Sequence, residues 1–161
     1  MLIAVMSDSH DHVENVRSIA RIATHSNCSA LIHLGDITGP AAVDGLKDFP
    51  GSIQGIFGNC DYRRTDLRRA FQAVGGRIDP GPLEITLGGR ILMIMHEPLG
   101  IDSLAVTGRC DVIMHGHTHT PRNSRKKNTL ILNPGECGGW STSPSFAILD
   151  TNDLSAVHLP I

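Results

Sequence analysis

Leu2-Ile3-Ala4-Val5-Met6-Ser7-Asp8-Ser9-His10 is the most informative stretch of the sequence. It opens with a short apolar run that includes β-branched residues, which is typical of a buried strand. A carboxylate and an imidazole follow almost at once. Ligands of open sheets bind in the crevice beyond the carboxyl ends of the strands. This stretch therefore predicts a strand that carries polar groups to a binding site.

The same arrangement recurs along the chain. Further short apolar runs are Leu31-Ile32, Ile53 to Phe57, Ile91 to Met95 and Val112-Ile113-Met114. Just past the five runs stand side chains that can bind a cation: Asp8, His10, Asp36, Asn59, His96, His117 and His119. Because strand ends converge at one edge of a sheet, we expect these side chains to meet.

Helices are predicted between the first strands. Apolar residues at helical spacing predict a helix over roughly 12–26, with Asp11 as its N-cap. A strand over 30–35 follows, and then a short helix near 40–48 that Gly45 interrupts. Another helix, with apolar positions from Leu67 to Val74, is expected to stop at Gly75-Gly76.

The second half is richer in strands. Residues 83–87 and 91–95 flank Gly88-Gly89 and predict a β-hairpin. A helix over 101–107, a strand ending at His115, strands over 129–132 and 146–149, and a last strand ending near Leu159 complete the pattern. The order of elements predicts an α/β fold, with a mixed sheet or two stacked sheets flanked by helices.

Composition restricts the class of protein. The 161 residues fit a single domain, 1–161. A net charge of -2 gives no general attraction to nucleic acid or to an anionic membrane. The N-terminal apolar run is too short for a signal peptide and no run approaches a transmembrane span, so we expect a cytoplasmic protein. The four cysteines form no C-x-x-C pair, and Cys28 and Cys110 are expected to be buried thiols.

Each polar motif is weak by itself, since Asp8 and His10 are typical of a turn. His117 and His119 are stronger, because two residues two apart on an extended segment point to the same side. Five strands that all end on such groups indicate a metal site. Nitrogen and oxygen donors suit Mn²⁺, Fe²⁺, Co²⁺, Ni²⁺ or Zn²⁺. Seven groups exceed the needs of one ion, and a two-metal site suits displacement at phosphorus.

The blocks resemble a known family. Ser7-Asp8-Ser9-His10, Leu34-Gly35-Asp36, Gly58-Asn59-Cys60-Asp61, Met95-His96 and Gly116-His117-Thr118-His119 are similar to the five signature blocks of the calcineurin-like metallophosphoesterases. The small size and Asn133-Pro134-Gly135 resemble the compact phosphodiesterase subgroup of archaea and bacteria. The resemblance implies two stacked mixed β-sheets flanked by helices (an αββα sandwich), with a dinuclear metal site at the C-terminal ends of the strands.

The resemblance also implies roles for individual residues. One ion is expected between Asp8, His10, Asp36 and His119, and the second between Asp36, Asn59, His96 and His117. Asp36 would bridge the two ions, of which Mn²⁺ is the foremost candidate. The resemblance implies hydrolysis of a small phosphodiester by a hydroxide that bridges the metals, with Asn59 and His10 among the catalytic residues.

Two positions depart from the family pattern. Many members have a histidine, taken to be the general acid, where this chain has Cys60, and a thiol is a poor hydrogen-bond donor. We therefore hypothesise that aryl esters react much faster than alkyl esters; the alternative is that Cys60 only fills space. His96-Glu97-Pro98 replaces the usual His-Gly-His, and Glu97 either supports a ligand histidine or, as we favour, faces solvent.

Other features leave alternatives open. His33 and His115 are expected to be hydrogen-bonded core residues, and the basic clusters at 63–69 and 122–127 are either solvated faces or a rim that attracts phosphate esters. Trp140 either covers the site or a partner surface, or plugs a sheet edge, and Cys137 is a candidate redox or metal-edge residue.

A second class of function also remains. The retromer scaffold subunit is a relative of the same family, so a non-catalytic scaffold or protein-interaction module is the alternative to an enzyme. A membrane partner is not expected, nucleic acid would need more aromatic surface, and the edge strands leave room for a homodimer.

Overall fold

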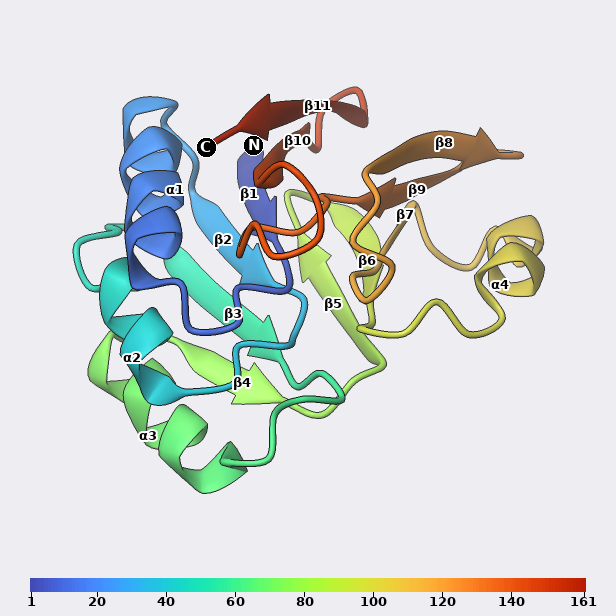
Figure 1. The fold of residues 1–161 in the computed structure, drawn as a ribbon. Coiled ribbons are helices and arrows are strands. Elements are labelled where there is room, and N and C mark those ends of the chain that lie inside the picture. The colour runs from blue at the N-terminus through green and yellow to red at the C-terminus, as the bar shows by residue number, and fades with distance from the viewer.

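A computed structural model describes all residues, 1–161, and places two β-sheets face to face (Figure 1). The six-stranded sheet has the order β11-β10-β1-β2-β3-β4. Its strands are β1 (Leu2–Met6), β2 (Ala30–His33), β3 (Ser52–Ile56), β4 (Arg77–Asp79), β10 (Ser145–Asp150) and β11 (Ser155–Pro160). The five-stranded sheet has the order β5-β6-β7-β9-β8. Its strands are β5 (Leu83–Leu87), β6 (Arg90–Ile94), β7 (Val112–Met114), β8 (Arg122–Lys126) and β9 (Thr129–Asn133).

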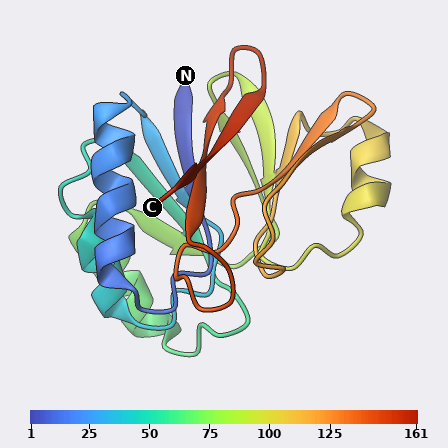
Figure 2. The same ribbon diagram turned by 45° about the horizontal axis from the view of Figure 1, so that its top comes forward.

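Helices cover the outer face of each sheet (Figure 2). The six-stranded sheet carries α1 (Val13–His25), α2 (Pro40–Val43) with the 3₁₀ turn η1 (Asp44–Leu46), and α3 (Arg64–Ala73), whereas the five-stranded sheet carries α4 (Ile101–Thr107). A buried cluster that includes Val5, Ile32, Leu92 and Met114 fills the space between the sheets. The expected two stacked sheets flanked by helices are confirmed. No helix has the length and apolar character that crossing a bilayer requires.

The parallel strands bring the polar loops together. β1, β2 and β3 pair in parallel in one sheet, and β6, β7 and β9 do so in the other. The residues that follow these strands therefore leave the two sheets at a common edge. This edge holds all seven side chains singled out by the sequence.

The expected elements differ from the structure in four places. Asp11 is not the N-cap of α1; His12 is, with Nδ1 accepting the Asn15 N–H at 3.3 Å. The reason is that Asp11 has a left-handed backbone and donates its N–H to the Ile37 carbonyl. The short helix near 40–48 is one α turn followed by a 3₁₀ turn that contains Gly45. The edge strands β4 and β8 were not expected, because both are short and largely polar.

Candidate metal centre

An unusual backbone shapes the loops of the candidate centre. Positive φ angles occur at Asp8 (56°), His10 (42°), Asp36 (56°), His117 (65°) and His119 (58°). Residues other than glycine seldom adopt this conformation, and it persists where the surroundings enforce it, often at functional sites. Five of the seven candidate ligands stand on residues with this backbone conformation. This indicates that the loops are shaped to point the candidate ligands toward one another.

Asp8, His10 and His119 form one group, with ligand atoms within 4.8 Å of one another. His119 Nε2 lies 3.3 Å from Asp8 Oδ1, which is buried and has no hydrogen-bond partner. His119 Nδ1 is 2.7 Å from the Ser141 hydroxyl. If Nδ1 donates there, the lone pair of Nε2 faces a carboxylate oxygen, and two acceptors in this position need a cation between them.

His96, Asn59 and His117 come together beside the first group. His96 Nδ1 is 2.9 Å from the Leu34 carbonyl, which can only accept, so Nδ1 carries a hydrogen and the neutral ring presents its lone pair at Nε2. That atom lies 2.9 Å from Asn59 Oδ1, which is also 2.9 Å from His117 Nδ1. His117 and Asn59 are exposed, whereas His96 is buried. Two imidazole nitrogens and one amide oxygen, all of which can bind a cation, thus meet at one point.

Asp36 lies between the two groups. Its Oδ2 is 4.0 Å from His10 Nε2 and its Oδ1 is 3.4 Å from His96 Nε2. Burial raises the pKa of Asp36, but a hydrogen bond from the protonated ring of His96 and another from the Cys60 N–H outweigh it and hold the pKa well below its usual range. Burial raises the pKa of Asp8. A charged Asp36 and an uncompensated Asp8 make the centre receptive to positive charge.

Asp61 stands at the end of the block Gly58-Asn59-Cys60-Asp61, and no role was predicted for it. Its buried carboxylate accepts N–H groups from Asp36, Ile37, Thr38 and Gly58, at 2.7 to 3.0 Å. One side chain thus ties the loop after β2 to the loop after β3. An added Cβ on Gly58 would collide with Asp36, so this close approach also requires glycine there.

Glu136 was missed altogether, because nothing in its sequence spacing marks it. It is fully buried and accepts the N–H groups of Trp140, Ser141 and Thr142. Burial raises the pKa of Glu136, but the bonds from Ser141 and Trp140 outweigh this and lower it. Glu136 Oε2 lies 3.1 Å from His119 Nδ1, so the carboxylate orients that imidazole.

Cys60 and Glu97 are the two positions that depart from the family pattern, and the structure places both at least partly in solvent. Cys60 is partly exposed; its N–H donates to Asp36 Oδ1 at 2.8 Å, and its Sγ is 3.3 Å from Asn59 Nδ2. Desolvation and the neighbouring Asp36 raise the pKa of the Cys60 thiol to about 11. Glu97 is exposed, which confirms the solvent interpretation.

The remaining expectations are settled by burial. His33 is buried and shares a 2.9 Å hydrogen bond with Ser9 Oγ, and His115 is buried with Nδ1 close to the Gly116 carbonyl, so both are core residues as expected. Cys28 and Cys110 are buried free thiols, as expected. Cys137 is fully buried, and burial raises the pKa of its thiol far above the usual range, which argues against a redox role.

Two pockets adjoin the centre. One of about 270 Å³ is lined by residues that include Asn59, His96 and Arg64. The other, of about 340 Å³, is lined by His10, Thr38 and Trp140. Trp140 is 70% exposed, so the interpretation that it plugs a sheet edge was wrong. Each pocket borders a different part of the ligand cluster.

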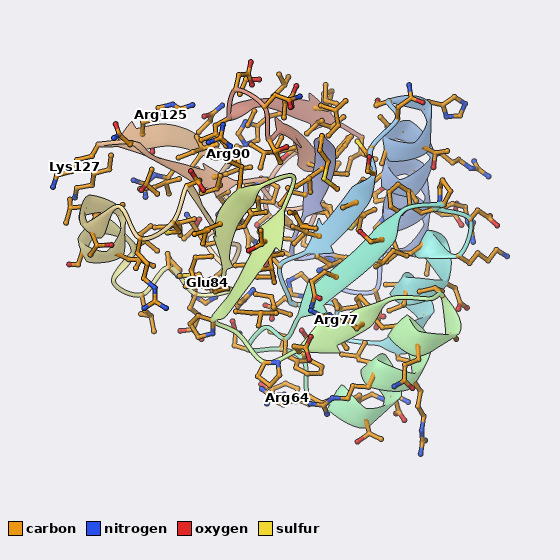
Figure 3. The ribbon with its side chains drawn as sticks, turned by 180° about the vertical axis from the view of Figure 1, so that it is seen from behind. Arg64, Arg77, Glu84, Arg90, Arg125 and Lys127 are labelled. Carbon is orange, nitrogen blue, oxygen red and sulfur yellow. The ribbon has the colours of Figure 1, made fainter.

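The largest cavity lies away from the cluster. It measures about 590 Å³ and runs between β3 and β4 of one sheet and β5 of the other, where Arg77 and Glu84 line it (Figure 3).

The two basic clusters lie in different parts of the molecule. Arg64 borders the pocket at Asn59, whereas Arg125 and Lys127 lie on and beside β8, far from Arg64 (Figure 3). Neither Arg125 nor Lys127 lines a pocket at the centre.

Two stacked sheets with an Asp, Asn and His cluster at the strand ends are what the calcineurin-like resemblance implies. The family model for the calcineurin-like phosphoesterase superfamily domain matches residues 1–154, and the chain belongs to this family. Phosphodiesterase MJ0936 of Methanocaldococcus jannaschii is 30% identical over 162 residues, covering 94% of this chain and 93% of the relative.

Solved structures agree with this assignment. An archaeal phosphodiesterase superposes with a TM-score of 0.93 at 28% identity, covering all of both chains. A Vps29 variant from Entamoeba histolytica reaches 0.72 at 18% identity, covering 100% of this chain and 99% of the other. The second likeness concerns the fold alone. The expected membership of the small phosphodiesterase group is confirmed.

Proposed function

We propose that residues 1–161 form a single domain that hydrolyses phosphodiesters with the help of two divalent metal ions. The observation that carries this proposal is the convergence of lone pairs: Asp8 Oδ1 is buried without a partner, and His96 Nε2 faces the oxygens of Asn59 and Asp36. Buried acceptors that face one another are costly unless a cation or a proton lies between them.

The donor set fits two ions. Asp8, His10, His119 and one oxygen of Asp36 would hold the first ion, and Asn59, His96, His117 and the other oxygen of Asp36 the second. Nitrogen and oxygen donors without thiolate suit Mn²⁺, our first choice, or Ni²⁺, Fe²⁺, Zn²⁺ and Co²⁺. When bound, such ions neutralise phosphoryl oxygens and lower the pKa of water, which supplies hydroxide near neutral pH.

Other residues of the protein hold the candidate metal ligands in place. Asp61 fixes the backbone that presents Asp36, and Glu136 with Ser141 fixes the ring of His119. Cys60 is the neutral thiol nearest the cluster and donates hydrogen bonds poorly. Cys60 is therefore poorly suited to protonate a leaving alkoxide. This favours substrates whose leaving groups are acidic and need no proton.

Diesters fit the site better than monoesters do. A phosphodiester carries two substituents on phosphorus, and pockets border the cluster both at His10 and at Asn59. A monoester would leave one of the two pockets empty. Arg64 at the second pocket supplies a cation for a phosphate or ester oxygen.

The test is hydrolysis of bis-p-nitrophenyl phosphate beside p-nitrophenyl phosphate by metal-stripped protein, with Mn²⁺, Ni²⁺, Zn²⁺ or Mg²⁺ added back. We expect metal-dependent turnover that favours the diester and is lost in His117→Ala. No turnover with any ion, in protein that binds two metals, would instead favour the scaffold function.

A further inference from the structure

We propose that Trp140 selects the substrate by stacking on an aromatic ester group, so that the preferred substrates are aryl or nucleoside phosphodiesters. This inference rests on the function proposed above and names its substrate class. It concerns the pocket lined by His10, Thr38 and Trp140.

The first observation is the exposure of the ring. Trp140 is the only tryptophan of the chain and is 70% exposed. The indole is a large apolar surface with a polar edge, and such side chains recur where a ligand or partner covers them. A tryptophan left open beside a reaction centre is therefore available to a ligand.

The second observation is position. His10, a candidate ligand of the first ion, lines the same pocket as Trp140. A phosphate bound at the cluster would extend one of its substituents along this pocket. The other substituent would point toward the pocket at Asn59 and Arg64.

The third observation is that hydrogen bonds tie the loop to the end of β1. The Glu136 carboxylate accepts a hydrogen bond from the main-chain N–H of Trp140. The main-chain N–H groups of Cys137 and Gly138 donate to the carbonyls of Ser7 and Asp8 at 2.9 and 3.0 Å. A Cβ on Gly138 would lie 2.9 Å from Trp140 Cδ1, so the indole packs against that glycine. The ring is thus tied to the same strand end as Asp8, and little ordering is needed when a ligand binds.

The Thr38 side of this shallow hollow is fixed as well. Thr38 donates its N–H to Asp61 at 2.8 Å, and Asp61 also holds the loop that presents Asp36. Thr38 and His10 are polar, so the indole is the main apolar surface of the pocket. A flat aromatic group can cover it by stacking, and this interaction tolerates any base because every base has a π-face.

Two stable probes test the proposal: p-nitrobenzylphosphonate and methylphosphonate, which share the phosphoryl group and differ in the ring. Both are titrated as inhibitors of bis-p-nitrophenyl phosphate hydrolysis by the Mn²⁺-loaded protein. We expect the aromatic probe to bind about tenfold more tightly, the size of one stacking contact. Trp140→Ala should remove this preference and Trp140→Phe should keep most of it. Tyr62→Ala, which deletes another exposed aromatic ring, should keep all of it.

Fluorescence gives a readout that does not depend on turnover. Because Trp140 is the sole tryptophan, p-nitrobenzylphosphonate should quench it saturably and beyond its effect on N-acetyltryptophanamide, whereas methylphosphonate should not. An unchanged preference in Trp140→Ala, or no saturable quenching, would overturn the inference while hydrolysis persists. If no diester is hydrolysed with any metal, the proposed function fails, and this inference fails with it.

Discussion

Glu136 Oε2 lies 3.1 Å from Nδ1 of His119, and the same carboxylate accepts three consecutive N–H groups from Trp140 to Thr142. One fully buried carboxylate therefore links an imidazole of the candidate centre to the loop that carries the exposed tryptophan. This link makes Glu136 the residue we expect to position His119 in the proposed metal centre.

We predict that Glu136→Gln weakens binding of the first metal ion by about 10- to 100-fold, because the partner that orients His119 loses its charge. Isothermal titration of Mn²⁺ into metal-stripped protein measures the effect. Glu97→Gln, at an exposed position directly after His96, is the matched control and should leave both affinities unchanged. Equal affinity in Glu136→Gln and wild type would remove the positioning role.

Asp61→Asn should destabilise the fold by roughly 1.5–3 kcal/mol, because an amide replaces a charged acceptor of four backbone N–H groups. For a domain of this size that corresponds to a fall in Tm of about 3–12 °C. Calorimetry of metal-free protein checks it. Asp66→Asn, at a partly exposed position of α3 where the carboxylate pairs with Arg63, should shift Tm by no more than a degree or two. A similarly small shift in Asp61→Asn would count against the proposal that Asp61 ties the two loops together.

The leaving group should matter strongly for this chain. With Cys60 as a poor donor beside the centre, methyl p-nitrophenyl phosphate should react far faster than dimethyl phosphate. Cys60→His should raise the rate on alkyl diesters selectively, by about 10- to 100-fold, through general acid catalysis. Comparable wild-type rates on both esters would refute the hypothesis.

Thiol reactivity should separate the cysteines. Cys28, Cys110 and Cys137 are buried, whereas Cys60 is partly exposed. Ellman's reagent should therefore modify one thiol in the native protein and four after denaturation. Slow reaction at pH 8 is expected even for Cys60, since its thiol pKa is raised to about 11. Rapid modification of two or more thiols in the native protein would contradict the burial of Cys28, Cys110 and Cys137.

The candidate site was accessible to sequence reasoning because the parallel strands are marked by short apolar runs, and the chain places a polar group just after each. The hairpin of β5 and β6 was likewise predictable from Gly88-Gly89, both of which adopt positive φ. β4 and β8 were not, since an edge strand needs no apolar run: β8 reads Arg-Asn-Ser-Arg-Lys.

The roles of the buried residues Glu136 and Asp61 could not be predicted from the sequence either. Glu136 and Asp61 are acidic residues in loops, for which solvent exposure is the normal expectation. Only the folded backbone shows that each meets several N–H groups. The position of Trp140 also depended on the path of the loop after β9, which no spacing in the sequence encodes.

Anomalous diffraction from crystals soaked in Mn²⁺ would show whether the centre holds two metal ions. We predict two peaks, one among Asp8, His10 and His119 and one among Asn59, His96 and His117, with Asp36 between them. A single peak, or none, at saturating Mn²⁺ would contradict it.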